Sequence, residues 1–126
     1  MMDQPSVLEL VAAVREFIEK HAMPQLQGHT AFHARVAANA LAIVGRELER
    51  GAQASLDEAT RLSSQFALEG SIEEMNRALC RSIRSGDIAI DDPRLAEHLC
   101  QTTLVKVAID QPNYSGLQNS PLKNQL

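Results

Sequence analysis

HTAFHARVAANALAIVGRELER, the stretch from His29 to Arg50, decides the fold that this sequence predicts. At about 100° per residue, its apolar side chains cover more than half of a helix circumference. This apolar surface is formed by Phe32, His33, Val36, Ala37, Ala40, Leu41, Ile43, Val44 and Leu48. A surface helix buries a single stripe, so we expect this helix to be central, with neighbours on several sides.

The remaining arc of the same helix carries two rows of a different kind. Small residues recur at four-residue spacing, and a polar row lies beside them. These are Ala34, Ala38 and Ala42, and Arg35, Asn39 and Arg46. Small residues let another backbone come close, and the polar row must be hydrogen-bonded wherever it is covered. The polar row is the first candidate for a functional site.

The composition favours one helical domain. A chain of 126 residues buries roughly two-thirds of its unfolded surface. Apolar residues make up 44% but aromatic residues only 3%, so the core must consist of Leu, Ile, Val and Ala, which suits close-packed helices better than sheets. The net charge is -4 with no dense basic run, and phosphate binding needs a positive patch. We therefore expect no nucleic-acid partner.

Cysteine usage and hydropathy predict a soluble cytoplasmic protein. Cys80 and Cys100 each lie in an apolar-periodic segment and form no CxxC pair, so we expect reduced, buried thiols. The first six residues lack the basic region of a signal peptide. No stretch of eighteen apolar residues is uninterrupted, so no membrane span is expected.

Three capping boxes predict helix starts, because each Ser and the Glu three residues later satisfy each other's free backbone donors. The pairs are Ser6 with Glu9, Ser55 with Glu58, and Ser71 with Glu74. The helices that follow them are expected over 7–21, 56–68 and 72–85. Glycines near helix ends favour a left-handed terminator. Gly51, Gly70 and Gly86 are expected to end the helices 29–50, 56–68 and 72–85.

The last helix is predicted over 93–110. Asp92 caps it, and Pro93 stands where its missing backbone donor does no harm. This helix is apolar almost all the way round, which makes it the second central helix. The preceding GDIAIDD segment has no second strand to pair with, so we expect a loop held by Ile88 and Ile90.

Together these elements predict an all-α fold, a bundle of five helices. Helices 29–50 and 93–110 are expected at its centre, and the less hydrophobic helix 56–68 at its periphery. Residues 1–114 form a single helical domain in this prediction. Residues 115–126 are polar and aperiodic, and we expect a mobile C-terminal tail.

The second central helix has a polar row of its own, formed by Thr102, Thr103, Lys106 and Asp110. If the two central helices pack together, Arg35 and Asn39 meet this row in a covered cluster. One interpretation is a structural network that fixes the register of the helices. The other is a site for a small anion or carboxylate, built on Arg35 and Lys106.

Metal and catalytic chemistry have little support. His29 and His33 stand four apart on one helix, a spacing that can place two imidazoles on one metal. No spacing brings a third ligand from His98, Cys100 or a carboxylate. There is also no glycine-rich phosphate loop, nucleophile elbow or acidic pair at a defined spacing. We expect no metal, no cofactor and no catalytic residue.

Two segments carry a resemblance to a known family. FHARVAANALAIVGREL at 32–48 and TTLVKVAIDQPNYS at 102–115 resemble a family of small bacterial helical proteins of unknown function. Its members are encoded beside, or fused to, aminoglycoside-phosphotransferase-like kinases, often near acyl-CoA dehydrogenases. The similarity runs from Pro5 to Tyr114, and the family offers no catalytic residues to carry over. The matching positions are Phe32, His33, Arg35, Asn39, Thr102, Thr103, Lys106, Asp110, Asn113 and Tyr114.

The resemblance implies association rather than a reaction. We expect a non-enzymatic accessory or interaction domain that binds a kinase-like protein through helix 56–68 or through segment 88–90 with 113–117. A homo-oligomer formed through the same patch is the competing expectation. The alternative function is a small-anion or acyl-metabolite binding protein that uses the polar cluster of both helices. That cluster comprises His33, Arg35, Asn39, Thr102, Thr103, Lys106 and Asp110.

Overall fold

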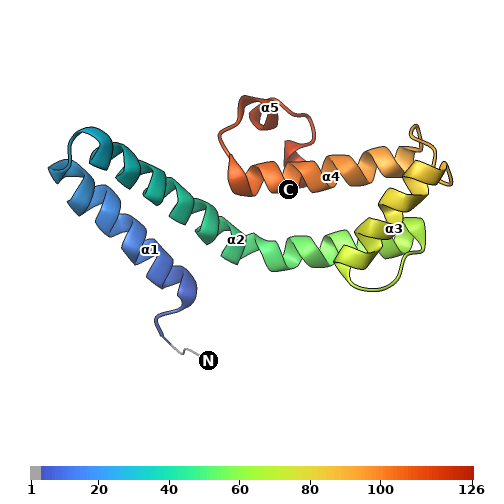
Figure 1. The fold of residues 1–126 in the computed structure, drawn as a ribbon, viewed down its shortest axis with the longest axis horizontal. Helices are drawn as coiled ribbons and strands as arrows, with labels where there is room; N and C mark the ends of the chain where they lie inside the picture. The colour runs from blue at the N-terminus through green and yellow to red at the C-terminus, as the bar shows by residue number, and fades with distance from the viewer. Residues whose placement is uncertain (1–3) are drawn as a thin grey trace. The chain divides into compact units, whose positions relative to one another are not determined.

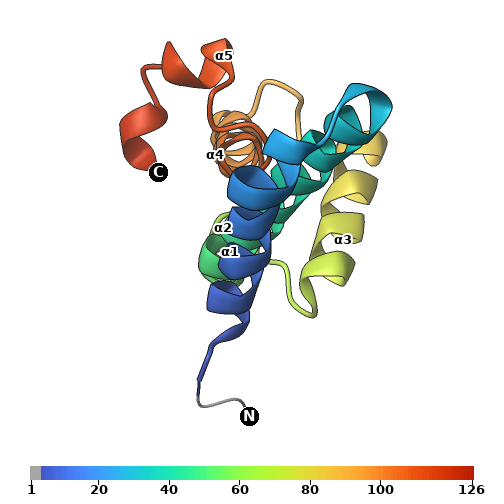
Figure 2. The same cartoon turned by 90° about the vertical axis from the view of Figure 1, so that its left-hand side faces the viewer.

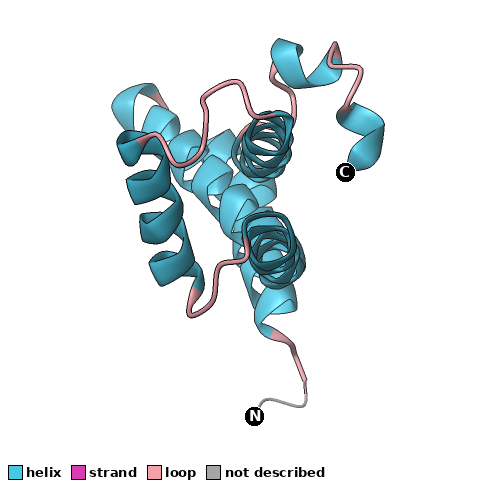
Figure 3. Ribbon diagram, turned by 90° about the vertical axis from the view of Figure 1, so that its right-hand side faces the viewer, coloured by secondary structure: helices cyan, strands magenta, loops and turns pink. Residues whose placement is uncertain are grey.

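The computed structural model describes residues 4–126, apart from the side chain of Gln125, and these residues form helices joined by short loops (Figures 1 and 3). No strand occurs within the described range, so the predicted all-α class with five helices is confirmed. None of the described helices is both long and apolar enough to cross a membrane. The α-helices are α1 Val7–Phe17, α2 Gly28–Phe66, α3 Ile72–Ser85, α4 Pro93–Asp110 and α5 Ser115–Gln118.

Two of the three predicted capping boxes are present. The Ser6 hydroxyl accepts from the Glu9 backbone N–H at 3.2 Å, and the Glu9 carboxylate accepts from the Ser6 N–H at 2.7 Å. The same reciprocal pair starts α3, between Ser71 and Glu74. Gly86 ends α3 with φ 83°, the left-handed conformation expected of a terminator. The Asp92 cap and the start of α4 at residue 93 are also confirmed.

The third capping box is wrong, and so is the helix end predicted at Gly51. Residues 29–50 and 56–68 are not two helices, because α2 runs unbroken through both segments to Phe66. A single interior glycine costs a helix only about 1 kcal/mol, and the residues around it, Ala52 and Ser55 among them, tolerate helical geometry. The Glu47 side chain also lies over Gly51, where a Cβ would stand. Ser55 is therefore an interior helical residue and caps nothing.

The structure divides into two compact units, and unit 1 comprises residues 1–51. Figure 1 shows α1 alongside the first part of α2. The face of α2 that carries Ala38 and Gly45 is the covered one: Ala38 is 2% exposed, and Leu8 of α1 lies 3.8 Å from the Cβ position of Gly45. α1 itself has no buried residue. The small-residue arc of α2, rather than its broad apolar surface, thus forms the covered side of this unit.

That broad apolar surface remains exposed. Phe32 is 57% exposed, Val36 48% and Leu48 47%. The expectation that residues 29–50 form a helix surrounded on several sides is therefore not confirmed within unit 1. The sequence pattern predicted that these side chains pack against another element. It did not predict whether that element belongs to this chain or to another molecule.

Unit 2 comprises residues 52–126 and contains the main core. Part of α2 packs with α3 and α4, and the buried residues at their junction are Leu62, Met75, Leu79 and Leu95. Leu62 has no exposed surface, and the prediction that segment 56–68 lies at the periphery of a bundle is not confirmed. The loop before α4 is held by Ile88 alone, because Ile90 is 85% exposed.

The opposite side of α4 buries a second, smaller cluster. Leu104 and Ala108 of α4 pack with Leu117 of α5, and Val107 and Leu122 lie against them. α5 follows the end of α4 (Figure 2). Because residues 115–126 are mostly polar, the sequence did not predict that Leu117 and Leu122 pack against α4.

Both cysteines are free but exposed, so the prediction of buried thiols is wrong. Cys80 immediately follows Leu79, which occupies the core position of that helical turn. Cys100 lies two residues after His98, whose side chain points into the core of unit 2. A residue one or two positions away on a helix faces a different direction, and the apolar periodicity did not resolve this difference.

Candidate functional site

A polar cluster lies inside unit 2. It is formed by buried His98 of α4 with the half-buried residues Glu58 and Arg61 of α2 and Thr102 of α4. We call it the His98 cluster. His98 is 1% exposed and is the buried polar residue of the described core. The Arg61 guanidinium donates to the Thr102 hydroxyl at 3.3 Å, which connects the two helices.

The imidazole of His98 has mostly apolar surroundings. Its ring meets the Phe66 ring edge-on, with centroids 5.8 Å apart and an interplanar angle of 82°. Burial lowers the pKa of His98, the positive charge of Arg61 lowers it further, and Glu58 opposes both effects weakly. The imidazole is therefore held neutral near pH 7, because a charged ring would lose its hydration without gaining a sufficient counter-charge.

Three buried polar atoms near this junction have no hydrogen-bond partner among the described residues. They are Arg61 Nε, Gln65 Oε1 and His98 Nδ1. Glu58 is better satisfied, because Asn76 of α3 donates to its carboxylate at 2.9 Å and to the Ile72 carbonyl at 3.0 Å. The cluster thus links α2 with both α3 and α4.

The start of α4 is fixed beside this cluster. Arg94 donates to the Gln65 carbonyl at 3.0 Å, and its guanidinium lies 5.7 Å from the centroid of Phe66. It also pairs with Asp92 at 2.6 Å, and these hydrogen bonds hold the pKa of the Asp92 carboxyl below its usual range. The residue that caps α4 and the residue that anchors it to α2 are therefore joined to each other.

The chemistry of the His98 cluster suits positioning better than turnover. The imidazole has almost no accessible surface through which a solute could reach it. Buried polar groups in such an arrangement specify one register of the helices, since any shift would leave more of them unpaired. The described residues contain no group of three or more His, Cys, Asp or Glu placed to hold a metal ion.

The residues predicted from the two polar rows are distributed over both units. His33, Arg35 and Asn39 are exposed residues of unit 1. In unit 2, Thr102 is half-buried and paired with Arg61, and the rest of its row is exposed, namely Thr103, Lys106 and Asp110. Asn39 is exposed in unit 1, and a contact between the two rows stays a prediction.

Sequence reasoning missed Arg61 and the central place of His98. A signal for His98 was present, because Leu95, His98, Thr102 and Ile109 share one helix face. Apart from the half-buried Thr102, these residues are buried. A histidine at a core position of this periodicity predicts a satisfied or neutral buried ring. Arg61 was not predicted to belong to a polar cluster, because segment 56–68 was expected at the periphery of the fold.

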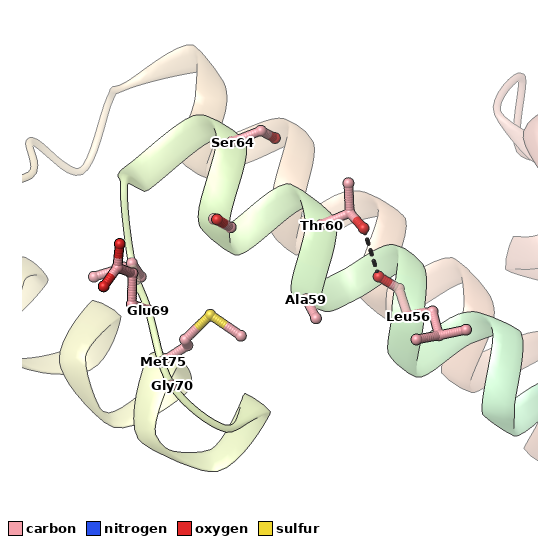
Figure 4. Close-up of a pocket in the computed structure, with 9 residues that line it drawn as sticks. Leu56, Ala59, Thr60, Ser64, Glu69, Gly70 and Met75 are labelled. Atoms are coloured by element: carbon pink, nitrogen blue, oxygen red, sulfur yellow. Dashed lines mark hydrogen bonds between the residues drawn. The ribbon is translucent and has the colours of Figure 1, made fainter.

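The surface of unit 2 contains an open groove of about 560 Å³ between the end of α2 and the start of α3 (Figure 4). Its apolar lining is Leu56, Ala59, Leu68 and Met75. Its polar lining is Thr60, Ser63, Ser64 and Glu69, with Gly70 at the turn. The Thr60 hydroxyl donates to the Leu56 carbonyl at 2.8 Å, as the dashed line in Figure 4 shows. We call this the α2/α3 groove.

A second groove, of about 600 Å³, runs along the outer face of α3. It is lined by Ile72, Glu73, Asn76, Arg77, Cys80, Arg81 and Arg84. Arg77 is paired with Glu73 at 2.5 Å. Three guanidinium groups on one helix face give this groove a basic character.

Comparison with known proteins adds one finding. Residues 24–114 match the model of a family described as "Domain of unknown function (DUF6285)". The matched range includes all of α2, α3 and α4. No curated protein and no solved structure gives a significant match.

Proposed function

This chain belongs to the DUF6285 family, and from this premise we propose that it is a non-enzymatic accessory domain that binds a kinase-like protein. The resemblance of 32–48 and 102–115 to proteins encoded beside or fused to aminoglycoside-phosphotransferase-like kinases supports this partner. Fusion raises the effective concentration of two domains that already have some affinity. Separate chains of the same kind then meet through the same contact surface, without the linker.

The observation that carries the proposal is the α2/α3 groove. Leu56 is 63% exposed at its edge, while Met75 in the same groove is only 4% exposed and belongs to the core. An apolar side chain from a partner therefore gains contact with an ordered floor. The hydroxyls of Thr60, Ser63 and Ser64 surround this floor and offer hydrogen bonds at the rim. Apolar centres with polar rims are typical of protein interfaces.

The groove also lies where the sequence had suggested a contact surface, on segment 56–68. A helix or loop of the partner with one large apolar anchor fits its dimensions, because anchors in such pockets provide most of the binding energy of an interface. We expect the kinase-like partner to place a Leu, Met or Phe side chain against Leu56 and Ala59.

The test is co-expression of this chain with the kinase-like protein of the adjacent gene, followed by affinity capture and measurement of the dissociation constant. Leu56→Lys places a charge in the groove and should weaken binding at least about tenfold, or about 1.4 kcal/mol. Leu99→Lys is the matched control. Leu99 is also about half exposed, at 51%, but it lies on α4 and does not line the groove.

Unchanged affinity in Leu56→Lys would show that the partner uses another surface. Absence of any complex with the unaltered chain would remove the accessory role itself. Equal loss in Leu56→Lys and Leu99→Lys would indicate general damage to unit 2, and circular dichroism of both variants checks for this damage.

A second candidate function is binding of a small anion, and the groove on α3 favours it. Arg81 and Arg84 line this groove with Arg77, and guanidinium groups match phosphate and carboxylate geometry. A thermal-shift screen with phosphates, acyl-CoA compounds and short carboxylates tests this function. A ligand at about 100 times its dissociation constant stabilises the folded state by about 2.7 kcal/mol. Loss of the shift in Arg81→Gln would locate the site, and no shift from any compound would count against it.

A further inference from the structure

The exposed apolar surface on the first part of α2 has an unusual internal order. The apolar residues before Ala40 and those after it stand at equal distances from Ala40 along the helix. Phe32 stands as far before Ala40 as Leu48 stands after it, and Val36 and Val44 are related in the same way. Ala37 and Ile43 form a further pair of this kind, and His33 and Glu47 form the last.

We propose that this surface, which we call the Ala40 face, binds a second copy of the chain through an antiparallel, two-fold symmetric contact between the two α2 helices. Two-fold interfaces are self-complementary, so residue i of one copy meets residue j of the other and j meets i. With Ala40 on the two-fold axis, residues at equal distances before and after Ala40 come to the same height on the two helices. The surface lies wholly in unit 1, so the inference is independent of the α2/α3 groove and of the kinase-like partner.

Side-chain size changes along the face as a crossing of two helices requires. Ala40 and Ala37 are small and exposed, and they permit close approach at the centre. Helices diverge from their crossing point, so the gap between them widens toward the ends. Phe32 and Leu48 stand at those ends, 57% and 47% exposed, and are large enough to fill it.

Charge favours the antiparallel direction. In an antiparallel pair, the Glu47 carboxylate of each copy meets the His33 imidazole of the other, which can donate a hydrogen bond or carry a positive charge. In a parallel pair, Glu47 would meet Glu47 and His33 would meet His33. Like charges that face each other are destabilising, so the parallel pairing is disfavoured.

The face offers apolar surface along its whole length. Val36 and Val44 are 48% and 44% exposed, similar to the two larger end residues. Contact with a second copy removes part of this surface from water on both copies, which favours association.

Light scattering on the purified full chain over a range of concentrations gives the first measurement. The proposal predicts a mass of two chains. In Ala40→Glu, two carboxylates meet across the symmetry axis, and the dimer dissociation constant should rise at least about tenfold. Ala13→Glu is the matched control, an equal change at an exposed alanine of α1. Glu is a good helix former, so both variants should keep their helical content.

A cross-linking experiment tests the direction of the helices in a background with Cys80 and Cys100 replaced by Ser. Val36→Cys chains mixed with Val44→Cys chains should form a disulfide-linked heterodimer, and neither variant should link efficiently with itself. Self-linking of both variants would indicate the parallel arrangement and would overturn the proposal. A monomer at every concentration, or a dimer that Ala40→Glu leaves as tight as Ala13→Glu does, would overturn it too.

Discussion

At His98 of unit 2, burial, ring packing and protonation affect one another. It is 1% exposed, its ring packs against Phe66, and burial together with Arg61 lowers its pKa. Folding therefore disfavours protonation of the His98 imidazole, and protonation of the imidazole disfavours folding. The contribution of the His98 cluster to stability therefore depends on pH.

We predict that the chain is less stable near pH 5.5 than near pH 7.5, and that His98→Gln removes this difference. The pKa of His98 in the folded state lies below its ordinary value of 6.5, which the unfolded chain retains. As the pH falls below 6.5, the unfolded state takes up a proton that the folded state does not, so unfolding becomes easier. The free energy of unfolding by urea at both pH values measures the effect.

His29→Gln is the matched control, because His29 is exposed and belongs to neither the His98 cluster nor the Ala40 face. The carboxyl groups of Glu9, Glu74 and Asp92 also have altered pKa values, but these lie below the ordinary values of 4.5 for Glu and 3.8 for Asp. They therefore titrate outside the chosen pH range. A His98→Gln variant with the same pH dependence as the unaltered chain would contradict the account.

At the residue scale, the sequence predicted two polar rows but did not predict which residues contact them. Thr102 was predicted to belong to a polar row, and its observed partner is Arg61 of α2, which neither row includes. Periodicity shows which side chains share a face of one helix. It does not show which face of another helix they meet, because this depends on packing between segments far apart in the chain.

At the scale of elements, the same Ser-x-x-Glu pattern had two different outcomes. It starts α1 at Ser6 and α3 at Ser71, but Ser55 lies inside α2. Ser6 and Ser71 follow non-helical residues, whereas the residues before Ser55 are helical and the helix continues through it. A capping box stabilises a helix start but does not force one, since continuing the helix satisfies the same backbone donors.

We predict that Ser71→Ala lowers the free energy of unfolding by about 1 kcal/mol, because the Glu74 backbone N–H loses its acceptor. Ser55→Ala should change it by less than about 0.5 kcal/mol, because the residue is exposed and in the helix interior. Urea denaturation of the two variants measures both values. A cost for Ser55→Ala equal to that for Ser71→Ala would mean that α2 is broken at this point in solution.

The boundaries of α3 and α4 were predictable because each has a strong signal at its start, and α3 also at its end. Gly86 adopts the left-handed conformation that favours glycine, and Asp92 accepts from the Arg94 backbone N–H at 2.8 Å. Gly51 gave a false signal, since glycine tolerates both the left-handed turn and the helix interior. Local sequence did not separate these cases.

At the scale of the whole molecule, the composition predicted the all-α class, and the apolar surface of residues 29–50 predicted a central helix with neighbours on several sides. This bundle arrangement is not confirmed. In unit 1, α1 has no buried residue and large side chains of α2 remain exposed. Apolar surface of this extent on a folded chain is typical of proteins that associate.

We propose two separate surfaces for association. They are the Ala40 face of unit 1 for a second copy of the chain and the α2/α3 groove of unit 2 for the kinase-like partner. Because they use different residues, Ala40→Glu should leave partner binding intact, and Leu56→Lys should leave dimerisation intact. The two variants thus allow each association to be lost without the other.

The central claim is that this chain acts by binding a kinase-like protein, and isothermal titration calorimetry of the two purified proteins tests it most directly. Titrations at several temperatures give the heat capacity change, which is negative when apolar surface is buried. The account predicts saturable binding with a negative heat capacity change, and at least about tenfold weaker binding for Leu56→Lys. No saturable binding of the unaltered chain, at any of the temperatures and with both proteins folded, would contradict it.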